Sequence, residues 1–212
     1  DYEMAASDDP VQLEIDFPEQ PNRLTTLFRG ILAIPILIVG AFVLGGYSDS
    51  QSAEYAQEAG IGAGGGLFFA PLLMILFRQK YPRWWFDWNV QLLKFETRIF
   101  AYLFLLQHEY PSTDEDQSVN IQLEYPDAEN DLTRWMPLVK WFLAVPHYIV
   151  LFVLAIIGVF AVIIAWFAIL ITGSLPRGLF DYIVGVMRYG TRVQAYAFIL
   201  TTDEYPPFSL KE

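Results

Sequence analysis

The chain has 212 residues and a formal net charge of −11, and its hydrophobic share of 54% is higher than in most soluble domains. The acidity excludes nucleic acid as an expected partner, because phosphate binding requires a basic surface. The absence of cysteine excludes disulfides, thiolate metal sites and cysteine nucleophiles. The apolar residues lie in long runs, which is typical of a membrane protein.

The first predicted element is a short strand at 11–18. Leu13 and Ile15 alternate with acidic residues, the period-2 pattern of a strand with one buried face. An isolated strand would leave its backbone groups without partners. We therefore expect a small cytoplasmic sheet, in which extended tails near Glu109 and Thr201 pair with the strands.

A membrane hairpin is predicted at 27–77. Its apolar runs are Leu27–Leu44 and Ile61–Phe77, and the connector Gly45–Gly60 carries acidic but no basic residues. A helix as long as the first run measures about 27 Å, close to the roughly 30 Å of a hydrocarbon core. Pro35 lies inside this run and is expected to kink the helix.

An interfacial amphipathic helix is predicted at 84–107. Asp87, Lys94 and Arg98 follow one another at i, i+7 and i+11, so they share one helix face within about 40°. The rest of the surface is apolar. Tryptophans, which favour the headgroup layer, open the helix as interfacial anchors at Trp84, Trp85 and Trp88.

The second half predicts the same order of elements. A second membrane hairpin is expected at 138–172 and a second interfacial helix at 178–200. As one helix, the apolar run Leu138–Thr172 would measure about 52 Å, too long for one crossing. We therefore expect two short helices that turn near Gly158, with a wedge-shaped or re-entrant hairpin as the competing interpretation. The repeated charges of the second interfacial helix are Asp181, Arg188 and Arg192.

The two halves align, which indicates an internal duplication. Val11–Pro18 aligns with Val119–Pro126, and Tyr81–Leu106 aligns with Leu175–Leu200. In the same alignment Arg29 and Pro35 correspond to Lys140 and Pro146. The expected organisation is an acidic tail at 1–10, a first repeat at 11–111, an acidic linker at 112–118, a second repeat at 119–208 and a tail at 209–212.

The fold class that follows is a mostly α membrane protein. Each tandem unit would contain a strand, a transmembrane hairpin, an interfacial helix and a short extended tail, giving four membrane helices. All thirteen Lys and Arg residues can be placed on one side of the membrane, and basic residues stay cytoplasmic on insertion. We therefore expect an inner-membrane protein with its termini and interfacial helices on the cytoplasmic side, and with parallel repeats.

Two interpretations of the repeated charges stay open. Lys94, Arg98, Arg188 and Arg192, here called the basic stripe, are candidates for binding anionic lipid headgroups. Alternatively the charges are structural. Asp87 would then form an ion pair with Arg98 or with a residue of the other repeat, and Asp181 would pair with Arg192. No catalytic, cofactor-binding or metal-binding residues are predicted. His147 lies in a membrane run, where helix packing or a bond to a backbone carbonyl is expected for it.

Short motifs in a fixed order resemble a known family. They are the aromatic-proline after each strand, a Pro-Arg before a Phe-Asp helix, a Thr-Arg pair and the closing segment Tyr205–Phe208. Together they resemble the bacterial membrane protein family of unknown function numbered 4389, over roughly Val11–Leu210. The resemblance implies membrane embedding and implies no activity. The insert Gly45–Gly66 departs from the second half.

The leading functional hypothesis is a non-enzymatic accessory or scaffold subunit of a larger membrane assembly. Its expected partners are the lipid bilayer, anionic phospholipids, and other membrane subunits or further copies of the chain. The alternatives are a protein that shapes membrane curvature and a small transporter or channel. The transporter is less favoured because charge near the bilayer midplane is nearly absent. An enzyme that acts on lipids is the weakest option, because no pair of nucleophile and base is visible.

Overall fold

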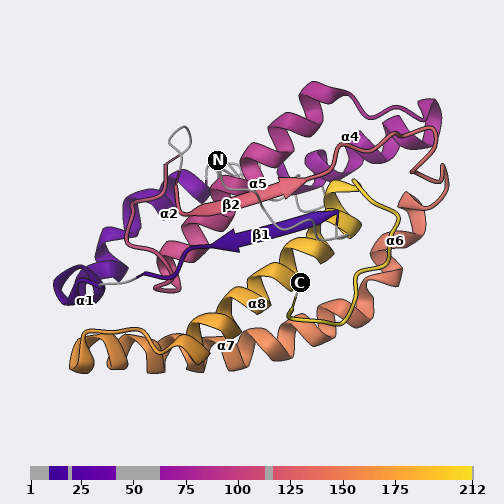
Figure 1. The fold of residues 1–212 in the computed structure, drawn as a ribbon. Coiled ribbons are helices and arrows are strands. Elements are labelled where there is room, and N and C mark those ends of the chain that lie inside the picture. The colour runs from indigo at the N-terminus through magenta and orange to yellow at the C-terminus, as the bar shows by residue number, and fades with distance from the viewer. Residues whose placement is uncertain (1–9, 19–20, 42–62, 113–116, 212) are drawn as a thin grey trace, which may run out of the picture.

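A computed structural model describes residues 10–18, 21–41, 63–112 and 117–211 (Figure 1). In chain order the elements are β1 (Val11–Ile15), α1 (Arg23–Leu32), α2 (Ile34–Gly40), α4 (Ala63–Arg78), α5 (Arg83–Leu103), β2 (Val119–Leu123), α6 (Pro137–Leu143), α7 (Val145–Thr172), α8 (Arg177–Gln194) and the π-helical turn η2 (Ala195–Ile199). The helices predicted at 84–107 and 178–200 correspond to α5 and to α8 with η2.

The two strands pair with each other. β1 and β2 are antiparallel, with Leu13 opposite Ile121 at the centre of the register. The predicted pairing with the tails near Glu109 and Thr201 is wrong. Both strands alternate apolar and polar residues, so together they present one continuous apolar face and one polar face that is open to water.

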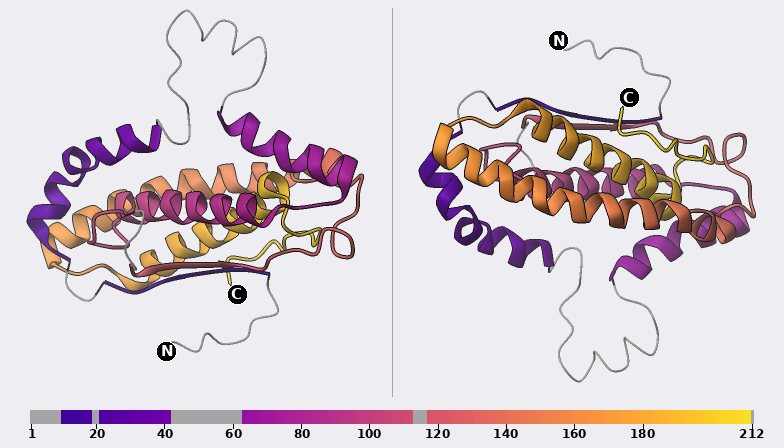
Figure 2. Two further views of the ribbon diagram at one scale, coloured as in Figure 1. Left: turned by 90° about the horizontal axis from the view of Figure 1, so that it is seen from above. Right: turned by 90° about the horizontal axis from the view of Figure 1, so that it is seen from below.

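The molecule is layered, with the sheet on one side and apolar helices on the other. Helix α5 packs on β2 and helix α8 packs on β1. Figure 2 shows the sheet edge-on, with α5 and α8 next to it and with α1, α2 and α4 on the side far from the sheet. The apolar face of the sheet meets these helices in a core that includes Leu13, Ile121, Leu93, Phe180 and Val184.

The second apolar segment forms one long helix and not a hairpin. Helix α7 runs without interruption through Gly158, so the turn predicted there is wrong. Its 28 residues measure about 42 Å. The continuous helix pairs the backbone N–H and C=O groups of the segment with one another, whereas a turn at Gly158 would leave some of them without partners.

The helix breaks lie before the prolines instead. Ala144 separates α6 from α7, and Pro146 occupies the first turn of α7, where a missing N–H is tolerated. The first half breaks at the aligned place, since Ala33 separates α1 from α2 and Pro35 opens α2. The α1–α2 pair bends by 42° there.

One helix of the described ranges is long and apolar enough to cross a membrane, and that helix is α7. Helices α1 and α2 pass the same test together, as a bent pair. The connector Gly45–Gly60 and the end of the run Leu27–Leu44 fall outside the described residues. The first membrane hairpin therefore remains a prediction, whereas the single helix α7 replaces the two helices that were predicted for the second.

Candidate functional site

Helix α7 carries more exposed large hydrophobic side chains than any other element that the structure describes. Its buried residues are His147 near its start and a narrow row at Ala161, Ala165 and Ile169 against the neighbouring helices. Other residues of α7 are half-buried, and many of its large side chains are exposed, including Ile149, Phe152, Val159, Phe160, Ile164 and Ile171. Apolar area on this scale requires a cover of lipid or protein.

Two members of the basic stripe form hydrogen bonds with the chain segments that follow their own helices. Arg98 is 7% exposed and donates from Nη1 to the carbonyl of Ser112 at 2.8 Å. Arg192 is 3% exposed and donates from Nη1 to the carbonyl of Lys211 at 3.0 Å and to that of Ser209 at 3.3 Å. These contacts favour the structural interpretation for both arginines.

The other two members of the stripe also lie inside the fold. Arg188 is half-buried and donates from Nε to the carbonyl of Leu13, which ties α8 to β1. Lys94, at the aligned position of α5, is half-buried too. Three members of the stripe therefore bond the carbonyls of β1 or of the tails, and the binding of headgroups by the stripe stays a prediction.

The repeated aspartates lie apart from the stripe. Asp87 is exposed and forms an ion pair with Arg83 at 3.9 Å, one turn away, and not with Arg98. Asp181 is exposed as well, and within the described ranges it has no ion pair with Arg192. The predicted ion pairs Asp87–Arg98 and Asp181–Arg192 are therefore not formed. In both helices the arginine bonds main-chain carbonyls, whereas the aspartate is exposed to solvent.

The tryptophans at the start of α5 lie on the outside of the molecule. Trp84 is 66% exposed, Trp88 is also exposed, and Trp85 is half-buried between them. The rings of Trp84 and Trp85 meet edge to face at 5.3 Å. Such a group of exposed indoles suits the boundary between lipid and water.

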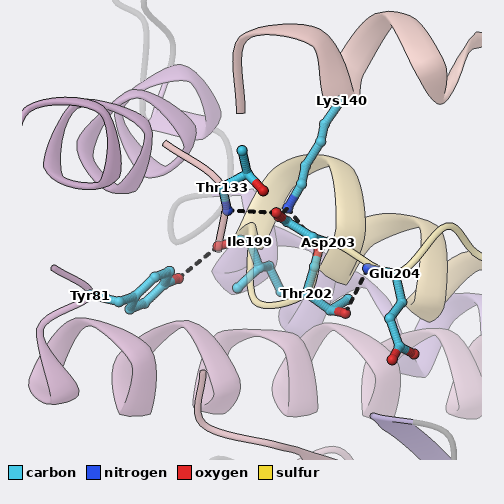
Figure 3. A network of polar contacts seen from close by, with 7 residues as sticks. All are labelled: Tyr81, Thr133, Lys140, Ile199, Thr202, Asp203 and Glu204. Carbon is cyan, nitrogen blue, oxygen red and sulfur yellow. Dashed lines mark hydrogen bonds and ion pairs between the residues drawn. The ribbon is translucent and has the colours of Figure 1, made fainter. Parts of the chain in front are cut away.

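A buried lysine holds the C-terminal segment, and sequence reasoning missed it. Lys140 is fully buried, and its Nζ lies 2.6 Å from both the Asp203 carboxylate and the Thr202 carbonyl (Figure 3). The other carboxylate oxygen of Asp203 accepts a bond from the backbone N–H of Thr133 at 2.6 Å. The Lys140 ammonium also lies over the Tyr196 ring. The network joins α6 to the residues that follow η2.

The aligned residue of the first half, Arg29, occupies a similar place without a carboxylate. Arg29 is 3% exposed and donates to the Tyr102 carbonyl at 2.9 Å and to Nδ1 of His108 at 2.8 Å. Its guanidinium lies over the Tyr102 ring, as Lys140 lies over Tyr196. The alignment of Arg29 with Lys140 was the available signal, but sequence alone did not show that both are buried.

His147 docks the last residues of the chain against α7. It is fully buried and hydrogen-bonds the hydroxyl of Tyr189, where the sequence suggested helix packing or a bond to a backbone carbonyl. The Phe208 ring stacks on its imidazole at 4.3 Å, and the Tyr205 ring lies at 4.6 Å. Desolvation raises the pKa of Tyr189 to about 12, with a further contribution from Tyr205, so its hydroxyl remains protonated at neutral pH.

Glu96 gives the fold a specific dependence on pH. It lies on α5 and accepts a hydrogen bond from Gln194 of α8, while desolvation raises its pKa above the usual value of 4.5. The folded chain therefore holds this proton more tightly than the unfolded chain, so stability falls as pH rises through the window between the two pKa values. We expect Glu96→Gln to raise the unfolding temperature at pH 7.

The matching measurement is thermal unfolding in micelles at several pH values. The gain from Glu96→Gln is expected to shrink as the pH falls towards 4.5. The exposed Glu129→Gln variant serves as the control and should change little at any pH. A Glu96→Gln gain that does not vary with pH would show that the charge of Glu96 is not its cause.

Among the residues described, no group of three or more His, Cys, Asp or Glu side chains is arranged to hold a metal ion. The chain matches no curated protein and no solved structure. Residues 134–209, which run from just before α6 to the segment packed on His147, match a family described as Domain of unknown function (DUF4389). The resemblance seen in the sequence is thereby confirmed over this part of the chain.

Proposed function

We propose that this chain is a non-enzymatic membrane protein that acts as an accessory or scaffold subunit of a larger assembly. The observation that carries the proposal is the exposed apolar surface of α7. A soluble domain would bury a helix that is apolar around its whole circumference. In the proposed arrangement lipid and partner helices cover α7, and the polar face of the sheet lies in the cytoplasm.

The layering favours a position for α7 along the membrane and not straight across it. Figures 1 and 2 both show α7 beside α8, and α8 carries β1 on its other side. If the sheet lies in water, both ends of α7 remain near the cytoplasmic surface. A crossing of the bilayer by α7 would also fit poorly. A helix of about 42 Å must tilt by about 45° to match a hydrocarbon core of roughly 30 Å, and this tilt is larger than the usual tilt of transmembrane helices.

Several contacts support the tandem duplication as part of this proposal. The residues at the centre of the sheet register, Leu13 and Ile121, are also equivalent in the sequence alignment, as a two-fold relation between the halves requires. Arg29 and Lys140 each lie over an aligned tyrosine. In this arrangement α7 corresponds to α2 and α4 joined without the insert.

Exposed basic residues offer a better headgroup site than the basic stripe. Arg78 ends α4, Lys80 follows it, and Arg134 precedes α6, which contacts α4. All three side chains are exposed, and Trp84 and Trp135 are exposed beside them in the chain. We assign the proposed binding of anionic lipid to this group, at about 1 kcal/mol for each charge near the surface.

Gentle extraction followed by native mass spectrometry tests both parts of the proposal. The scaffold role predicts a co-purifying membrane chain or a second copy, together with retained anionic lipid. The triple variant Arg78→Gln/Lys80→Gln/Arg134→Gln should lose about 3 kcal/mol of preference for anionic over zwitterionic lipid, on the order of 100-fold.

The control for this experiment is Lys211→Gln, since Lys211 is exposed on the C-terminal tail, away from α4 and α6. It should retain anionic lipid as the parent does. Recovery of only a free monomer would contradict the scaffold role. An unchanged lipid preference in the triple variant would contradict the assignment of the headgroup site.

The arrangement of helices on one side of the sheet also favours a second candidate, a protein that bends membranes. Apolar helices inserted mainly into one leaflet expand that leaflet and act as a wedge. Liposomes mixed with purified protein should then form tubules or smaller vesicles. An unchanged vesicle diameter at high protein density would exclude this role.

A further inference from the structure

An open hollow of about 390 Å³ lies between α1 and α7, and Leu103 and Leu105 at the end of α5 also line it. We call it the α1–α7 groove. Its walls are mainly apolar, with Leu105, Val162, Ile163 and Phe167 among them. Its size is within the range of pockets that bind small molecules.

The groove also contains a buried cation that the described chain does not neutralise. Arg29 lines the groove, and within residues 10–18, 21–41, 63–112 and 117–211 no carboxylate forms an ion pair with it. His108 accepts a hydrogen bond from Arg29, and desolvation followed by the Arg29 charge lowers the pKa of His108, so this ring stays neutral. The groove therefore keeps a full positive charge at its polar end.

The aligned site in the second half shows how such a charge is balanced. Lys140 is buried to the same degree, and the chain supplies the Asp203 carboxylate at 2.6 Å. A buried charge without a partner is costly, because neither water nor a counter-ion stabilises it. The first half thus lacks the anion that the second half contains.

Two polar side-chain atoms lie buried at this end of the groove. Nε of Arg29 and Oγ1 of Thr26 are buried and have no hydrogen-bond partner among the described residues. Both side chains line the groove, and Thr26 is fully buried. The Trp166 indole donates to the Thr26 carbonyl at 3.0 Å and fixes one wall. Two donors beside an apolar cavity match a carboxylate that carries a long hydrocarbon chain.

We propose that the α1–α7 groove binds a long-chain fatty acid, with its carboxylate at Arg29 and Thr26 and its hydrocarbon chain along α7. The inference goes beyond the scaffold role, since a chain with any membrane function can use this site. The ligand supplies the missing counter-charge, and burial of its hydrocarbon chain adds apolar contact.

Gly30 allows the site to be blocked without disturbing the fold. It lines the groove, and a Cβ at this position would meet no atom within 4 Å. Gly30→Leu therefore adds a bulky side chain at the wall of the groove without a clash at its Cβ, and it improves the helix propensity of α1. Gly158→Leu is the matched control, because Gly158 lies in α7 outside the groove and has equally open surroundings.

The test uses the full chain in zwitterionic nanodiscs with a photoreactive long-chain fatty acid. Cross-links are expected at residues 26–30 and 162–167, with oleate as an efficient competitor and oleyl alcohol, which lacks the charge, at least tenfold weaker. Gly30→Leu should reduce cross-linking at least tenfold, and Gly158→Leu should leave it unchanged. Thr26→Val, which removes one donor, should weaken oleate competition roughly 2- to 10-fold.

Equal cross-linking in Gly30→Leu and the parent would overturn the proposal, as would equal competition by oleate and oleyl alcohol. Thermal unfolding of each variant confirms that the fold is intact. Membrane flotation of Gly30→Leu should match the parent, so failure of the fatty-acid site is distinguishable from failure of the membrane assignment.

Discussion

Replacement of Asp203 by alanine is expected to lower the free energy of unfolding by about 3–5 kcal/mol. The change leaves Lys140 fully buried and without a counter-ion, and it also removes the acceptor for the backbone N–H of Thr133. The loss arises mainly from the unpaired charge and not from the net value of the ion pair. Unfolding in mixed micelles, followed by circular dichroism, measures it.

The matched control is Asp87→Ala. Asp87 also forms an ion pair, with Arg83, but both side chains are exposed and the separation is 3.9 Å. Exposed pairs contribute about 0–1 kcal/mol, so this variant should unfold almost as the parent does. Similar losses in Asp203→Ala and Asp87→Ala would show that the Lys140 network does not hold the C-terminal segment.

Replacement of Gly158 by proline is expected to cost about 3 kcal/mol or more. Proline at this position removes one backbone hydrogen bond of α7, and its ring collides with the carbonyl of Leu154. That carbonyl also accepts a bond from the Tyr182 hydroxyl, so the damage extends to the contact with α8. A hairpin turning at Gly158 would instead tolerate proline well.

Gly158→Ala provides the comparison, because alanine favours a continuous helix by up to about 1 kcal/mol over glycine. Its Cβ would meet no atom within 4 Å. Alanine should therefore stabilise the protein slightly, whereas proline destabilises it. If proline were neutral and alanine destabilising, the continuous α7 would be incorrect and the turn would be restored.

Local patterns in the sequence were sufficient to locate the strands and the charged helices. The alternation of apolar and polar residues predicted the strand Val11–Ile15, and the spacing of charged residues predicted the helices α5 and α8. Both patterns repeat with the period of a single element, so they can be read without knowledge of its neighbours. The helix breaks were less accessible. The sequence predicted a break at Gly158, but glycine is tolerated within an apolar helix. The structure has the break at Ala144 instead, two residues before Pro146.

Tertiary contacts decided the remaining differences. Arg98 and Asp87 share a helix face by spacing, yet the arginine reaches the carbonyl of Ser112 because the tail folds back over α5. The burial of Lys140 likewise depends on Asp203, which is distant in the sequence. No periodicity of one segment encodes such partners, and the sequence alignment of the two halves indicated the positions without their contacts.

The proposed function requires an apolar layer of helices that lies in lipid, with both ends of α7 on the cytoplasmic side. The chain contains no cysteine, so the variants Glu129→Cys and Ser174→Cys each carry one site for labelling. Both positions are exposed, and in the chain Glu129 precedes α7 and Ser174 follows it. In sealed vesicles, an impermeant maleimide should label both variants from the cytoplasmic face. Labelling of the two from opposite faces, or a protein that does not sediment with the membrane, would contradict the account.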